Sequence, residues 1–80
     1  MDEKEQLFAI GEAAKRAGVS RQSLQYYLMV GLLDPVQTTE SGRRLFDTAS
    51  VERIKLIKRL NASGYPLRAI RELFMHKREE

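Results

Sequence analysis

The 80-residue chain has no cysteine and only one histidine, His76. Without cysteine it can form neither a disulfide nor a thiolate metal site, and a lone histidine cannot complete a zinc centre. The same scarcity removes the Ser–His and Cys–His pairs that nucleophilic catalysis uses. We therefore expect no metal, no cofactor and no enzymatic activity.

Long apolar segments are also missing. The apolar runs, such as Leu32-Leu33, are short, so no segment is expected to span a membrane. The first five residues are largely acidic and lack the apolar core of a signal peptide. Internal repeats and low-complexity tracts are absent. The sequence therefore predicts one small, soluble, cytoplasmic domain with a modest core.

Positive charge is concentrated in the middle of the chain. Residues 15–59 hold nine Lys or Arg and four acids, a surplus of five positive charges, whereas the whole chain carries +3. A basic region on a small domain favours a polyanionic partner such as nucleic acid, although an ordinary solvated surface would give the same charge.

Capping residues and hydrophobic spacing divide the chain into elements. A short strand at 7–9 precedes helices at 10–17 and 21–30, which are joined by Gly18-Val19-Ser20. Two extended runs around a turn at 40–42 form a hairpin over 36–46, and helices follow at 48–62 and after Pro66. This order predicts a mainly α fold, a winged helix-turn-helix with a small β-hairpin wing and four helices. Two apolar stripes are expected in its core: Val51, Ile54, Ile57 and Leu60 on the third helix, and Leu67, Ile70, Leu73 and Phe74 on the fourth.

The first two helices have the features of a helix-turn-helix. Ala14 is small where the helices meet, Gly18 lies in the turn and Leu24 anchors the second helix. On a helical wheel, the side opposite the core carries Gln22, Gln25, Tyr26 and Met29. Glutamine can pair with adenine, and tyrosine hydroxyls can hold phosphates. Residues 21–30 are therefore predicted to be a recognition helix in a DNA major groove.

The hairpin is the second candidate element for binding. Arg43 and Arg44 adjoin its turn, where they can lie along the DNA backbone or enter a minor groove. Alone, such arginines are also typical of a solvated turn. Directly after a helix-turn-helix they indicate a DNA-binding wing.

Several spaced motifs, in order, resemble the N-terminal part of MerR-type bacterial transcription regulators. They are IGEAAKRAGVS at 10–20, SLQYY at 23–27, GLL at 31–33, ESGRRLF at 40–46, VERI at 51–54, GYPL at 64–67 and IREL at 70–73. The resemblance covers about residues 8–74. It implies a second wing built on the third and fourth helices. It also implies a homodimer on an inverted-repeat promoter, which is bent and untwisted so that RNA polymerase can engage it.

Combining the residue patterns with the resemblance gives a domain over 7–76, with tails at 1–6 and 77–80. The predicted DNA contacts are Lys15, Ser20, Arg21, Gln22, Gln25, Tyr26, Tyr27, Arg43, Arg44 and Arg68. Three positions depart from the family pattern, which usually has Arg at Gln25, Glu at Leu28 and an aromatic residue at Arg43. The family's long dimerisation helix and effector domain are expected to be absent from these 80 residues.

Two other functions remain open from the sequence. A chain this short could be an excisionase-like or architectural factor that bends DNA without sensing a signal. Gln25 and Leu28 are also compatible with a helical adaptor that has lost DNA reading and docks a protein partner.

Overall fold

The computed structural model describes residues 6–78, and their side chains as far as Phe74. Most of the predicted tails at 1–6 and 77–80, and the side chain of His76, therefore lie outside the described residues. The element order is β1 (Phe8–Ala9), α1 (Ile10–Ala17), α2 (Arg21–Met29), β2 (Gln37–Thr38), β3 (Arg44–Phe46), α3 (Thr48–Ala62) and α4 (Leu67–Arg78). This order confirms the predicted mainly helical fold with four helices and a hairpin. No helix among the described residues is long and apolar enough to cross a bilayer.

Local capping sets the helix boundaries. Gly18, at φ 78°, ends α1 in the left-handed conformation. The side chain of Ser20 accepts a hydrogen bond from the Ser23 amide (2.9 Å) at the start of α2, and that of Asp47 accepts one from the Ser50 amide (2.9 Å) at the start of α3. These boundaries confirm the sequence-based prediction, except that α2 ends one residue early, at Met29.

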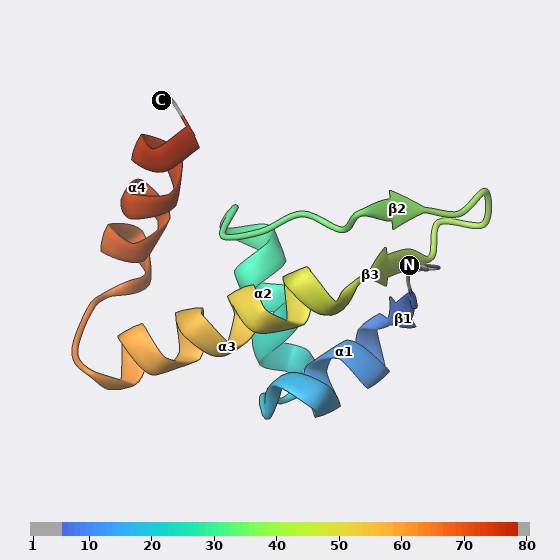
Figure 1. Cartoon of the computed structure of the whole chain (residues 1–80), viewed down its shortest axis with the longest axis horizontal. Helices are drawn as coiled ribbons and strands as arrows, with labels where there is room; N and C mark the ends of the chain where they lie inside the picture. The colour runs from blue at the N-terminus through green and yellow to red at the C-terminus, as the bar shows by residue number, and fades with distance from the viewer. Residues whose placement is uncertain (1–5, 79–80) are drawn as a thin grey trace.

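The three strands form one antiparallel sheet in the order β1-β3-β2. Phe8 pairs with Phe46 on one side of β3, and Thr38 pairs with Arg44 on the other. The sequence predicted the hairpin and a separate first strand, but not the pairing of β1 with β3. That pairing attaches the hairpin to the start of α1. In Figure 1 the hairpin and α4 lie at opposite ends of the molecule, and α3 runs between them.

The core is built where α1, α2, β3 and α3 meet. Its largest fully buried side chains are Phe46, Leu24, Leu32, Ile54, Ile57 and Ile70. Three buried alanines on one face of α1, Ala13, Ala14 and Ala17, let that helix pack closely against its neighbours. The predicted apolar stripe of α3 is confirmed, with Leu60 only partly buried.

The predicted stripe of α4 is wrong at one position. Ile70 is fully buried and Leu67 and Phe74 pack against the core, but Leu73 is 52% exposed. Successive helical residues are about 100° apart, so Leu73 and Phe74 fall on opposite flanks of Ile70. Because α4 packs on α3 through a narrow stripe that includes Phe74, with the Arg53 guanidinium 4.1 Å from that ring, the other flank faces solvent.

Candidate nucleic-acid interface

Helix α2 presents a sharply divided surface. Leu24 and Tyr27 are buried on its inner side, at 0% and 8% exposure. Gln22, Gln25, Tyr26 and Met29 are all exposed on the outer side. The predicted outward face is thus confirmed. An exposed face with no acidic residue is compatible with a polyanionic surface.

Three hydrogen bonds lie at the two ends of α2 and in the turn before it. The Ser20 side chain caps its first turn, and the Leu32 amide donates to the Tyr27 carbonyl (2.9 Å) beyond its last turn. The third bond comes from α3, where the Lys58 ammonium donates to the Gly18 carbonyl (2.8 Å) in the turn before α2. Lys58 is exposed, and its hydrogen bond joins α3 to the helix-turn-helix across 40 residues of chain.

The hairpin turn is held by its own polar groups. The Thr39 amide donates to the Arg43 carbonyl and the Gly42 amide donates to the Thr39 carbonyl, both at 2.9 Å. The Thr39 hydroxyl accepts from the Arg43 amide (3.0 Å). Gly42 supplies the positive φ, 89°, that a residue with a side chain rarely adopts. The turn therefore presents Arg43 and Arg44 to solvent from an ordered support.

Gln25 lies where three surface depressions meet. One, of about 520 Å³, is lined by α2 side chains together with Asn61 and Leu67, from the region where α3 passes into α4. A second, of about 380 Å³, extends to Asp34, Pro35 and Arg44. The third, of about 220 Å³, joins α2 to the hairpin and the start of α1. The structure thus brings the predicted recognition helix and wing onto one concave surface.

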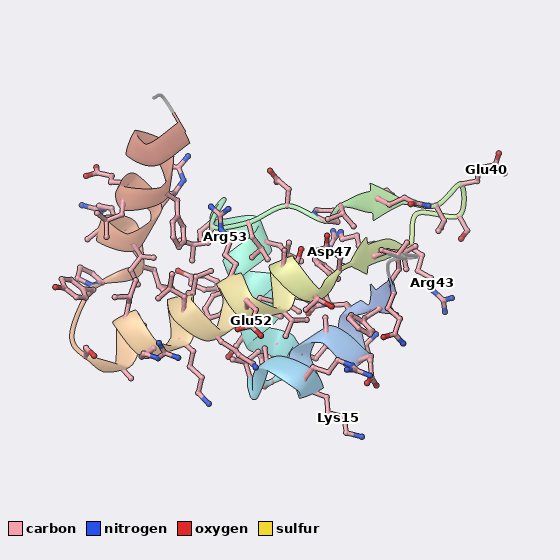
Figure 2. The ribbon with its side chains drawn as sticks, in the orientation of Figure 1. Lys15, Glu40, Arg43, Asp47, Glu52 and Arg53 are labelled. Atoms are coloured by element: carbon pink, nitrogen blue, oxygen red, sulfur yellow. The ribbon has the colours of Figure 1, made fainter. Side chains whose placement is uncertain are left out.

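The third depression has a basic lining. It contains Arg21 and Gln25 of α2, Gly42, Arg43 and Arg44 of the hairpin, and Ala9, Ile10 and Gly11 where β1 passes into α1. No acidic residue lines it. Figure 2 shows the Arg43 side chain extending outward from the turn of the hairpin. Sequence reasoning identified these arginines separately and missed their shared pocket, because the pocket depends on tertiary contacts: β1 pairs with β3, and α1 packs against both β3 and α2.

The remaining predicted DNA contacts differ in whether their side chains are exposed and whether they lie at the three depressions. Ser20 uses its side chain to cap α2, and Tyr27 is mostly buried, although it lines the largest of the three depressions. Lys15 and Arg68 are exposed but line none of the three. In Figure 2, Lys15 projects from α1 away from the hairpin. Among the described residues, no cluster of His, Asp or Glu offers a metal site.

A helix-turn-helix followed by a basic hairpin defines the class of winged helix-turn-helix DNA-binding domains. Within that class, the sequence model described as "MerR HTH family regulatory protein" matches residues 8–77. The chain therefore belongs to the MerR family of DNA-binding transcription regulators, which are not enzymes.

Two relatives and one solved structure illustrate the match. The chain is 36% identical over 66 residues to the mercuric resistance operon regulatory protein of Bacillus cereus, covering 82% of this chain and 50% of the relative. It is 34% identical over 67 residues to the transcriptional regulator ZntR of Escherichia coli K12, covering 84% and 48%. The crystal structure of HiNmlR, "a MerR family regulator lacking the sensor domain, bound to promoter DNA", aligns with a TM-score of 0.78 at 28% identity, covering 85% and 52%. The chain spans about half the length of the curated relatives it matches.

Proposed function

We propose that this protein regulates transcription by sequence-specific binding to double-stranded DNA, with α2 in the major groove and the hairpin on the backbone. The observation that carries the proposal is the concave surface on which Gln25, at the centre of the exposed face of α2, meets Arg43 and Arg44. A protruding helix and an adjacent basic loop can fit a groove and its bordering phosphates at the same time.

The candidate contacts divide into two groups. Gln22, Gln25 and Tyr26 lie on the exposed face of α2 and are proposed to meet base edges or neighbouring phosphates. The proposed backbone contacts are Lys15, Ser20, Arg21, Tyr27, Arg43, Arg44 and Arg68. Ser20 and Tyr27 are expected to contribute least, because one is engaged in a cap and the other is largely buried.

The partners of the whole protein are also part of the proposal. A single domain of this size offers the contacts of one half-site, so tight binding requires a second copy on an inverted repeat. We propose a homodimer in the full-length context that acts on RNA polymerase at a promoter in the bacterial cytoplasm. The promoter DNA named for HiNmlR supports this assignment. Residues 7–76 are proposed to be the folding unit of the DNA-binding domain.

Selection of bound sequences from a random double-stranded DNA pool tests the proposal. The affinity for the most enriched sequence is then measured as a function of salt concentration. We expect an enriched half-site, or an inverted pair of half-sites, and a steep loss of affinity with salt. Salt-dependent binding without enrichment would instead support an architectural DNA-bending factor. No binding even at low salt, and none after fusion to a dimerising helix, would support the protein-docking adaptor.

Two variants separate reading from backbone binding. Gln25→Ala should change which bases are preferred at one or two positions of the selected site. Arg44→Ala should weaken binding to all sequences alike and reduce the salt slope by about one unit. An unchanged preference for Gln25→Ala, or an unchanged affinity and slope for Arg44→Ala, would remove that residue from the mechanism.

A further inference from the structure

The depression between α2, the hairpin and the start of α1 has the chemistry of an anion site. Its lining brings together three arginines from two elements that are distant in sequence: Arg21 from α2, and Arg43 and Arg44 from the hairpin. The depression measures about 220 Å³ and is open to solvent, which leaves room for a phosphate group. We call it the Arg21–Arg43 pocket.

No acidic side chain lines the pocket itself, although Asp34 shares the neighbouring depression with Arg44. The ion pairs between described side chains are Arg16–Glu12 on α1 and Lys55–Glu52 on α3, and neither involves the pocket. All three arginines of the pocket are exposed. The positive charges around the depression repel one another. A bound anion would attract all of them and so offset this repulsion.

The start of α1 adds donors of a second kind. Its N-cap position is Ala9, which has no side chain able to accept from the first amides of the helix. The one acid in the first turn, Glu12, is bound to Arg16 at 2.8 Å. Apart from its chain neighbours and the backbone of its own helix, Gly11 has no atom within 4 Å of the place where a Cβ would lie, so a ligand can approach the backbone there. The helix dipole favours negative charge at this end.

From these observations we infer that the Arg21–Arg43 pocket binds one phosphate of the DNA backbone, held by Arg21, by Arg43 and by the first amides of α1. This inference rests on the proposed function and extends it. The phosphate joins the first turn of the recognition helix to the turn of the wing. Docking of the helix and docking of the wing are therefore a single coupled event, in which Arg21 and Arg43 act on the same group.

A double-mutant cycle on the selected duplex tests this coupling. Arg21→Gln and Arg43→Gln are each expected to lower affinity by about tenfold, the size typical of a lost charge-assisted hydrogen bond. Because both act on one phosphate, the double variant should bind only about as weakly as the weaker single variant. Arg21→Gln combined with Arg68→Gln is the matched control, because Arg68 is an exposed arginine outside the pocket. That pair should show additive losses. Additive losses for Arg21 and Arg43 would overturn the inference.

A titration with inorganic phosphate tests the pocket without DNA. Amide NMR spectra of the wild type should show saturable shifts at Gly11 and Gly42, and the Arg21→Gln/Arg43→Gln variant should lose them. If those shifts occur in a protein that binds no DNA, the pocket stands and the proposed function fails. If the protein selects a DNA site while Gly11 and Gly42 do not respond to phosphate, the function stands and the pocket is refuted.

Discussion

Arg21 occupies a position that costs the folded domain stability. It is the first residue of α2, and the first turn of that helix contains no acid. A positive charge at the positive end of a helix dipole is unfavourable by about 0.3–1 kcal/mol at a surface site. Arg21→Glu removes this unfavourable interaction with the helix dipole and adds a favourable interaction of similar size. Because the side chain is exposed and screened, we expect a net gain near the lower end, about 0.5–1 kcal/mol.

This gain is measurable in a domain of this size. A change of 1 kcal/mol moves the melting temperature of a 60–100-residue domain by about 4–8 °C, so Arg21→Glu should melt a few degrees above the wild type. DNA affinity should move in the opposite direction and fall by about a hundredfold or more, because the proposed phosphate contact would be replaced by repulsion. The two effects of one substitution thus have opposite signs.

Thermal melts by circular dichroism at low and high salt, with fluorescence anisotropy for DNA binding, measure both effects. Arg59→Glu is the matched control, because it makes the same change of charge in the last turn of α3, where a positive charge is favourable. That variant should melt below the wild type. If Arg21→Glu also lowered the melting temperature, or if its gain were unaffected by salt, the electrostatic reasoning would be refuted.

Two further substitutions test the packing that supports the site. Lys58→Met removes the bond to the Gly18 carbonyl and should lower the free energy of unfolding by about 1 kcal/mol in urea titrations. Lys55→Met, which breaks only an exposed ion pair within α3, should lower the free energy of unfolding by less than about 0.5 kcal/mol. Equal losses for Lys58→Met and Lys55→Met would show that the hydrogen bond to Gly18 does not stabilise the fold. Gly31→Ala should cost about 1–2 kcal/mol, because φ is +84° and the new Cβ would lie 2.9 Å from the Arg71 Nε atom. Adding Arg71→Ala should recover only the steric part of that loss; a single variant as stable as the wild type would exclude strain at this turn.

The helices could be predicted closely because their signals are local. Gly18 and Ser20 lie next to the helix ends that they determine, and Asp47 acts only three residues along the chain. The outward face of α2 could be predicted equally well, because the 3.6-residue helical period alone places Leu24 and Gln25 on different sides of the helix. These features need no knowledge of the rest of the fold.

The features that the sequence did not predict depend on a distant partner. The pairing of Phe8 with Phe46 and the hydrogen bond from Lys58 to Gly18 each join residues far apart in the chain. The sequence around these residues does not indicate which distant residue each will contact. The exposure of Leu73 depends on which stripe of α4 packs against α3, and the hydrophobic spacing along α4 does not determine that stripe. The Arg21–Arg43 pocket was missed for the same reason.

The distribution of charge on the candidate interface suggests how affinity and specificity are divided. The centre of the α2 face is neutral, with Gln22 and Gln25, whereas the cations lie at its first residue and on the hairpin. Neutral amides can distinguish bases but release few counterions, and arginines on phosphates do the reverse. The salt dependence of binding should therefore be set at the edge of the interface and the base preference at its centre. This separation would let the preferred sequence change through substitutions at Gln25 while the proposed backbone contacts of Arg21 and Arg43 stay the same.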